Sequence, residues 1–274
     1  MPEKFNICTI QPEGYNHSHA FAEVSLLLQS SLMSLSYDCT TSINGFYPDR
    51  VNIVLGSNLW APDPSTLKSI KYIPYQLKQL PTDRKWLIDR LSPILCNAKE
   101  IWDYSKENIA FLNELGLKAK YLPIGYHEKL ETIEHKADKD IDVLFYGSLN
   151  ERRKAILDGI SGIKTKVLFG VYGRERDEYI SRAKIILNVH SFESKILEVV
   201  RISYLLNNKC FIVSEESPIN PYKKVDLSMF EYKDILESCK HFVENPKKIE
   251  EIRDQNYKRF KESYNMIDLL KMVI

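Results

Sequence analysis

The sequence has little glycine, and it lacks the two common glycine-rich motifs that bind phosphate. Only 10 of its 274 residues are glycine, and neither G-x-G-x-x-G nor a Walker A sequence occurs. These motifs form the phosphate loops of standard NAD-dependent enzymes and of P-loop NTPases. Their absence argues against both classes of protein.

Paired cysteines and long apolar runs are also missing. The five cysteines lie far apart and none forms a Cys-x-x-Cys pair, so we expect reduced thiols rather than a zinc site or a disulfide framework. No apolar run approaches the roughly 20 residues that span a bilayer, and residues 1–6 do not resemble the start of a secretory signal. We therefore expect a cytoplasmic protein without a transmembrane segment.

The chain carries almost no net charge. Lys and Arg total 38 and Asp and Glu total 37, which gives a formal net charge of +1. A general electrostatic attraction to nucleic acid is excluded by this balance, although a local basic pocket is not. Nucleic acid is therefore not an expected partner.

Short apolar runs alternate with helical patterns along most of the chain. Residues 5–10, 51–55 and 142–146 have the composition of short buried strands. Apolar residues spaced by three and four between 21 and 35 predict a helix, for which Ser18 is a suitable N-cap. Strands that alternate with helices in this way indicate an α/β fold with parallel sheets.

A charged segment divides this alternation into two halves. Residues 127–140 lack a strong apolar period, and we interpret them as a linker. The linker separates an N-terminal domain over 1–126 from a second domain over 141–264, and a short helix follows within 265–274. Two α/β halves suggest a ligand cleft between them.

The first candidate site follows the strand over 142–146. Gly147 and Ser148 would let a ligand approach the backbone, and Arg152 and Arg153 add positive charge at the start of a helix. This combination suits a phosphate or a diphosphate. The alternative is a solvated first helical turn with both arginines on its outer face.

The second candidate site follows another strand and contains His190, Lys195, Glu198 and Arg201. The last three fall within a helix predicted over 194–206, where polar side chains that face inward need partners. One hypothesis is a ligand site. The other is an ion pair between Glu198 and Arg201, three residues apart on one helical face, beside a buried His190.

The third candidate site is a pair of histidines between the first strand and the first helix. His17 and His19 would lie at the carboxyl edge of the first sheet. Histidine suits general base catalysis because its pKa lies near the working pH of most enzymes. The alternative is that these side chains cap the helix or face solvent.

Several motifs together resemble those of GT-B glycosyltransferases, most closely the small bacterial and viral enzymes of the CgeB-like and family-1 types. The motifs are Ile-Trp-Asp-Tyr-Ser at 101–105, Leu-Pro-Ile-Gly at 122–125, Asp-Val-Leu-Phe-Tyr-Gly-Ser at 142–148, and the segment 190–201. The resemblance implies a GT-B fold, in which two Rossmann-like domains face a central cleft. It also implies that the final helix packs back on the first domain.

The resemblance also implies roles for particular residues. Glu198 matches the second glutamate of a Glu-x7-Glu pattern, which binds the ribose of the donor, whereas His190 replaces the first and argues against the retaining chemistry that uses it. Lys195 would lie beside the diphosphate. Tyr172 would stack on the nucleobase, or is an ordinary aromatic residue of a turn. His17, with His19 as a substitute, would be the base that activates the acceptor.

The function implied is transfer of a hexosyl or pentosyl group from a nucleotide sugar to a hydroxyl acceptor. The acceptor would be a sugar or glycan, in the synthesis of a surface polysaccharide or glycan. No metal or other cofactor is expected, because Arg152, Arg153, Lys195 and Arg201 supply positive charge for the leaving diphosphate. The alternatives are a nucleotide-sugar epimerase or hydrolase on the same fold, and a non-catalytic nucleotide-sugar-binding or scaffold protein.

Overall fold

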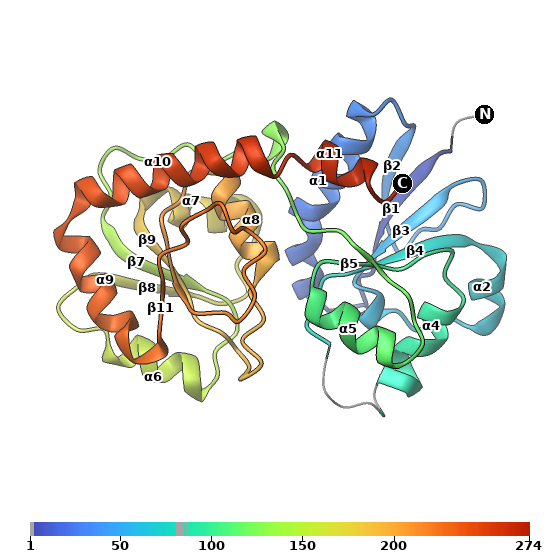
Figure 1. Cartoon of the computed structure of the whole chain (residues 1–274), viewed down its shortest axis with the longest axis horizontal. Coiled ribbons are helices and arrows are strands. Elements are labelled where there is room, and N and C mark those ends of the chain that lie inside the picture. The colour runs from blue at the N-terminus through green and yellow to red at the C-terminus, as the bar shows by residue number, and fades with distance from the viewer. Residues whose placement is uncertain (1–2, 81–84, 86) are drawn as a thin grey trace. The chain divides into compact units, whose positions relative to one another are not determined.

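The computed structural model describes residues 3–80, 85 and 87–274, which form two compact units (Figure 1). Unit 1 runs to His127 and also contains Met266–Ile274, whereas unit 2 is Glu128–Asn265. Each unit has one sheet of parallel strands with helices packed against it. This is the α/β class that the alternating pattern predicts.

Unit 1 is built on a six-stranded sheet with the order β2-β1-β3-β4-β5-β6. Every neighbouring pair is parallel. The strands are β1 Phe5–Thr9, β2 Cys39–Ile43, β3 Val51–Leu55, β4 Lys71–Gln76, β5 Trp102–Asp103 and β6 Lys120–Tyr121. The α-helices are α1 Ala22–Ser34, α2 Pro64–Ser69, α4 Ser92–Cys96, α5 Lys106–Glu114 and α11 Met266–Lys271.

The start of the first helix differs from the sequence prediction. Ser18 does not cap α1: its hydroxyl is buried and donates a hydrogen bond to the carbonyl of Ile10, at 2.7 Å. It belongs to a 3-10 helix, η1 Asn16–Phe21, which precedes α1. The predicted N-cap is therefore wrong, and the reason is that Ser18 fastens η1 to the chain that leaves β1.

Unit 2 is built on a five-stranded parallel sheet with the order β11-β10-β9-β7-β8. The strands are β7 Ile141–Tyr146, β8 Thr165–Leu168, β9 Ala183–Asn188, β10 Ile212–Glu215 and β11 Met229–Phe230. The helices are α6 Glu151–Gly159, α7 Gly173–Arg182, α8 Val199–Asn207, α9 Ile235–Glu244 and α10 Pro246–Ser263. Apolar residues of β7, β9 and β10 form one core with those of α6 and α9. This core fixes where the three central strands end.

The segment interpreted as a linker packs on unit 2. The backbone amides of Thr132 and Ile133 donate to the side chain of Asn208, at 2.8 and 3.0 Å. At the other end of unit 2, the backbone returns to unit 1, where Met266 donates to the carbonyl of Tyr126 at 2.9 Å and α11 packs on α1.

None of the helices in the described part of the chain is long and apolar enough to cross a membrane.

Candidate functional site

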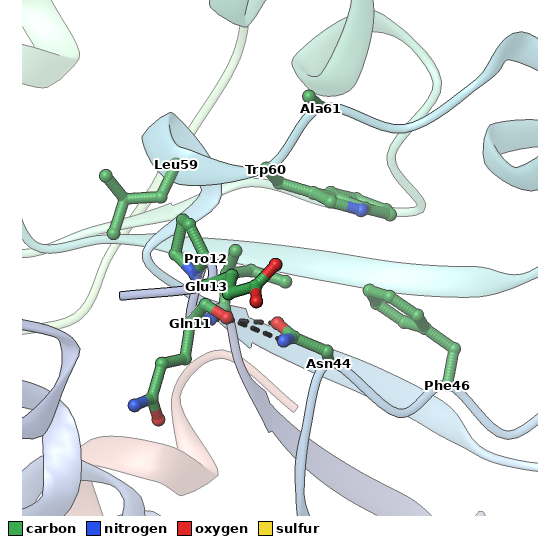
Figure 2. Close-up of a pocket in the computed structure, with 9 residues that line it drawn as sticks. Gln11, Pro12, Glu13, Asn44, Phe46, Leu59, Trp60 and Ala61 are labelled. Carbon is green, nitrogen blue, oxygen red and sulfur yellow. Dashed lines mark hydrogen bonds between the residues drawn. The ribbon is translucent and has the colours of Figure 1, made fainter. Parts of the chain in front are cut away.

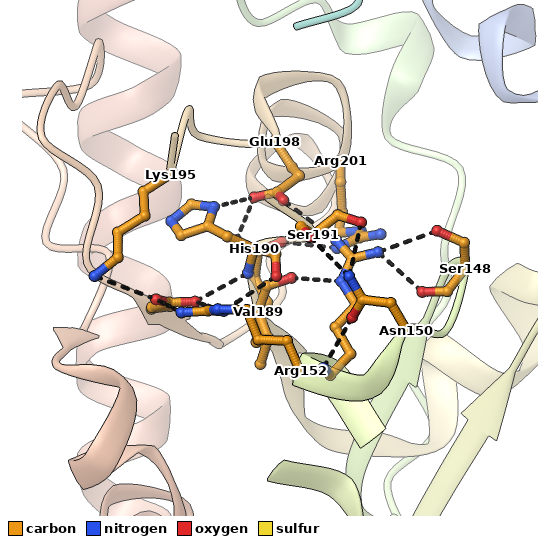
Figure 3. Close-up of polar contacts among 12 residues, drawn as sticks. Ser148, Asn150, Arg152, Val189, His190, Ser191, Lys195, Glu198 and Arg201 are labelled. Carbon is orange, nitrogen blue, oxygen red and sulfur yellow. Dashed lines mark hydrogen bonds and ion pairs between the residues drawn. The ribbon is translucent and has the colours of Figure 1, made fainter. Parts of the chain in front are cut away.

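A cluster of charged side chains gathers at the carboxyl end of the sheet of unit 2 (Figure 3). It lies where β7, β9 and β10 end, and this edge of a parallel α/β sheet is where ligands usually bind. We call it the polar cluster. It joins four cations to two carboxylates and one histidine: Arg152, Arg153, Lys195 and Arg201, Glu198 and Glu215, and His190.

Glu215 is the buried centre of one half of the polar cluster. Arg152 binds it with both terminal nitrogens, one of them at 2.6 Å, and Lys195 Nζ lies 3.6 Å from it. The backbone amide of His190 also donates to it, at 3.1 Å. Burial alone would raise the pKa of Glu215, but the bond from Arg152 and the other contacts hold that pKa below its ordinary value. Sequence reasoning missed Glu215, although an acidic residue that ends a buried strand, here 212–215, is a signal of a polar site.

Glu198 is the centre of the other half. Its oxygens lie 2.9 Å from Nδ1 of His190, 2.9 Å from Nδ2 of Asn188 and 3.3 Å from a terminal nitrogen of Arg153. Burial raises the pKa of Glu198, but contacts with His190, the charge of Arg201 and the bond from Asn188 lower it overall. Glu198 is therefore held as a carboxylate by residues from three different segments.

His190 is wholly buried inside this network. Its Nε2 lies 3.1 Å from the carbonyl oxygen of Glu216, and its Nδ1 faces Glu198. Both ring nitrogens thus face protein oxygens. The structure places His190 as a brace between the loops after β9 and β10, with no exposed surface for a donor sugar.

The two adjacent arginines that sequence analysis proposed for phosphate binding are engaged within the protein. Arg153 is buried, and it donates to the carbonyls of Val189 and Ser148 at 2.8 and 2.9 Å, as well as to Glu198. Burial and the nearby charge of Arg201 lower its pKa to about 10. Arg152 holds Glu215 and lies over the ring of Tyr232, 4.2 Å from its centre. Both side chains tie the loops together.

Lys195 and Arg201 are the cations of the polar cluster whose donors the described residues do not fully use. The Lys195 side chain is 39% exposed. Arg201 donates to Asn188 at 2.7 Å and lies over the Tyr146 ring, but its buried Nε has no hydrogen-bond partner among the described residues. Since an unpaired buried donor is costly, a bound acceptor at Arg201 would stabilise the site.

The loop that carries these residues is longer than the sequence pattern predicts. The helix expected over 194–206 begins only at Val199, because Lys195 has a left-handed backbone (φ 50°) and its carbonyl accepts a bond from Ser217 at 2.6 Å. Glu198 consequently precedes the helix and pairs with His190 and Arg153. The ion pair between Glu198 and Arg201 that was one hypothesis is replaced by these contacts.

Gly147 stands where a Cβ atom would crowd Arg201. Its φ is 140°, and a Cβ atom there would lie 2.6 Å from a terminal nitrogen of Arg201. The carbonyl and hydroxyl of the next residue, Ser148, contact Arg153. Tyr172 precedes α7 and is half-buried. Gly147 and Ser148, in the loop after β7, therefore lie against Arg201 and Arg153 respectively.

In unit 1, both predicted histidines lie on η1, the first helical element after β1. His17 is half-buried, with its ring 5.3 Å from that of Tyr15 and perpendicular to it, whereas His19 is exposed. The bond from Ser18 to Ile10 holds η1 at the carboxyl end of β1. The structure thus puts His17 at the sheet edge that the sequence indicated.

A pocket of about 270 Å³ opens at the same end of unit 1 (Figure 2). One wall is aromatic: the rings of Phe46 and Trp60 stack with their centres 4.7 Å apart. The other side is polar, where Gln11 and Asn44 exchange two hydrogen bonds of 2.8 and 2.7 Å beside Glu13. An aromatic wall opposite amide and carboxylate groups is suited to a small polar ligand with an apolar face.

Comparison with solved structures identifies the architecture. An α-glucosyltransferase in complex with UDP and a 13-mer DNA aligns with a TM-score of 0.65 at 9% identity, over 97% of both chains. Sucrose-phosphate synthase from Thermosynechococcus elongatus aligns at 0.61 and 12% identity, over 98% of this chain and 97% of that one. The chain has the GT-B fold. TarM of S. aureus is also similar, at 0.59 and 10% identity, over 94% of this chain and 57% of TarM.

Curated relatives give no function. Protein R358 of Acanthamoeba polyphaga mimivirus is 25% identical over 165 residues, which are 58% of each chain, and L140 of the same virus is 30% identical over 125 residues, 43% of this chain and 40% of L140. Both are named as uncharacterized, and the match spans about half the length of these relatives. No family model matches the chain.

Among the residues that the structure describes, no group of three or more His, Cys, Asp or Glu side chains could hold a metal ion.

The contact between Gly147 and Arg201 yields a first prediction. Gly147→Ala should lower the free energy of unfolding by about 1–3 kcal/mol, because the new methyl group must displace the Arg201 guanidinium. Gly162→Ala is the matched control, since Gly162 also has a positive φ (81°) but has open space around its Cβ position. Urea unfolding of both variants checks this, and equal losses would show that the approach of Arg201 is unimportant.

The lowered pKa of Glu215 yields a second prediction. A carboxylate whose pKa is lowered by folding stabilises the folded protein at pH values above its ordinary pKa of 4.5. This stabilisation is lost as the pH falls from there through the lowered pKa of the folded state. Glu215→Gln should therefore be less stable at pH 7, by about 3 kcal/mol, because Arg152 loses its partner. Its free energy of unfolding should also fall less steeply than that of the wild type between about pH 5 and about pH 3.

Glu262→Gln is the control for this prediction, because Glu262 is exposed. Its unfolding should keep the wild-type dependence on pH. Parallel pH profiles for the wild type and Glu215→Gln would contradict the prediction.

Proposed function

We propose that the protein is a glycosyltransferase that moves a sugar from a nucleotide-sugar donor to a hydroxyl group of a sugar or glycan. The observation that carries the proposal is the unbalanced charge of the polar cluster, in which four cations face two carboxylates. Lys195 and Arg201 are the two cations whose N–H groups the described part of the chain does not fully use. They lie at the end of the sheet where a GT-B unit binds its nucleotide sugar. A diphosphate would supply the missing negative charge.

Each residue of the cluster then has a defined task. Arg201 and Lys195 bind the diphosphate and stabilise the negative charge that develops on it as the sugar leaves. Glu198 accepts a hydrogen bond from a ribose hydroxyl beside the site. Arg152, Arg153 and His190 position these groups through Glu215 and Glu198. The half-buried Tyr172 is the candidate for stacking on the nucleobase.

Unit 1 would supply the acceptor side. An acceptor hydroxyl is a weak nucleophile at neutral pH and needs a base to take its proton during attack. His17 lies on η1 after β1, and the pocket with Phe46 and Trp60 offers an aromatic face for a sugar ring. Hydrolysis would not require such a pocket, which is why we favour transfer over a hydrolase.

Binding of UDP tests the donor site. Arg201→Gln and Lys195→Gln should each weaken UDP binding by about 1.5–3 kcal/mol, the usual value of a hydrogen bond to a charged group. Lys154→Gln on α6, which removes an exposed charge, should bind UDP as the wild type does. Isothermal titration calorimetry measures all three. If GDP and UDP bind neither to the wild type nor to Lys154→Gln, the donor assignment fails.

Turnover tests the base. His17→Ala should reduce glycosyl transfer by about 10²–10⁴-fold, because a general base contributes about that factor, and binding of UDP should not change. His19→Ala, two residues away on the same 3-10 helix, is the control and should keep most of the activity. Release of UDP from candidate donors, with and without acceptor, is the assay. Near-normal turnover in His17→Ala would remove His17 from the mechanism.

A further inference from the structure

A cavity in unit 2 lies at the opposite end of the sheet from the polar cluster. Its volume is about 440 Å³, and its lining includes Ala183, the first residue of β9, and Cys210, just before β10. The polar cluster follows the last residues of the same strands. A strand of six residues is roughly 20 Å long, so the two sites are separate.

The lining of this cavity is strongly basic. It contains five cationic side chains, Lys136, Lys139, Lys184, Lys209 and Arg253, against two carboxylates, Asp138 and Glu250. Lys184 is neutralised by Asp142, which is 2.7 Å away. Arg253 also lies 2.9 Å from Asp254, and Lys136 lies 4.0 Å from Glu178. The described residues supply no ion pair for Lys139 or Lys209, and these two lysines with Arg253 form what we call the basic pocket.

Lys139 shows that this charge is poorly compensated. The Nε2 of His135 lies 2.6 Å from the carbonyl oxygen of Asn208 and must donate to it, which leaves Nδ1 to accept from Lys139 Nζ at 3.2 Å. Lys139 also donates to the carbonyl of Ala183, at 2.7 Å. The Lys139 ammonium is thus held by neutral acceptors.

The surrounding cations repel this group. Burial first, and then the charge of Arg253, lower the pKa of Lys139. Burial likewise lowers the pKa of His135, with further contributions from Lys139 and Arg253. Like charges gathered in a half-buried cavity destabilise one another, and a bound anion would relieve that repulsion.

Lys209 occupies the position after the C-cap of a helix, where glycine is common. It follows the C-cap of α8 and has a left-handed backbone, with φ 51°. Such positions favour glycine because a Cβ atom costs energy there. The side chain at this position lines the cavity, and its Nζ lies 4.5 Å from the centre of the Tyr257 ring.

We propose that the basic pocket binds a small organic phosphate, a phosphomonoester with an apolar or ring-shaped part. The dianion would neutralise Lys139 and Lys209, which have no ion pair among the described residues, and Lys209 and Arg253 would be its principal ligands. Ile180, Phe211 and Ile249 line the same cavity and provide an apolar surface for the organic part. The volume lies within the roughly 300–1,000 Å³ typical of small-molecule sites.

Phenyl phosphate is a suitable probe, and two histidines report where it binds. In NMR spectra of the full chain, the ring signals of His135 should move and saturate as phenyl phosphate is added, whether or not the probe also enters the polar cluster and moves those of His190. Movement of His190 alone would mean that the probe enters only the polar cluster. That result, or no movement of His135, would overturn the proposal.

Variants test the ligands. Lys209→Asn, which keeps a residue that tolerates a left-handed backbone, and Arg253→Gln should each weaken phenyl phosphate binding roughly tenfold or more. Lys258→Gln removes an exposed charge from the same helix as Arg253 and should bind as the wild type does. Calorimetry that gives one affinity for all four proteins would overturn the proposal.

Two further measurements complete the test. Inorganic phosphate should bind more weakly than phenyl phosphate, since it cannot use the apolar surface; equal affinities would refute the organic part of the proposal. Affinity for UDP should be the same in Lys209→Asn, Arg253→Gln and the wild type. A failure of the donor assignment would therefore leave the His135 result unaffected.

Discussion

The pairing of Arg152 with the buried Glu215 is the interaction on which the rest of the polar cluster depends. Glu215 ends β10, Arg152 lies in the first turn of α6, and the same carboxylate accepts a hydrogen bond from the backbone amide of His190 after β9. One side chain thus sets the spacing of three strand ends. The cost of burying it is offset because both oxygens have charged or amide donors. The ring of His190 in turn contacts Glu198, so the position of the Glu198 carboxylate depends on that of Glu215.

Much of the fold could be predicted from the sequence, because buried parallel strands are short apolar runs. The sequence pattern does not indicate two strands of unit 1, β2 and β4. β2 (Cys39–Ile43) has three consecutive polar residues, Thr40, Thr41 and Ser42, and it forms the edge of the sheet. β4 contains Pro74, which argues against an interior strand; the register with β5 begins only at Tyr75, so the missing amide of Pro74 falls where that neighbour is absent.

The candidate site could be predicted in place but not in detail. The sequence put His17, Gly147 and the segment 190–201 at the ends of strands, and the structure has them there. It could not indicate that Arg152 pairs with a residue 63 positions away, because such a pair depends on how β10 lies beside β9. Nor could it predict that a single left-handed residue, Lys195, would delay α8 to Val199.

The return of Met266–Ile274 to unit 1 has a consequence for how the protein is made and dissected. In chain connectivity, unit 2 is an insertion within unit 1, whose last helix is translated after the whole of unit 2. Unit 1 can complete its fold only after residues 266–274 have left the ribosome, whereas unit 2 is continuous and can form earlier. A gene fragment that ends at residue 265 would therefore encode an intact second unit and an incomplete first one, and the two halves are not equivalent targets for expression on their own.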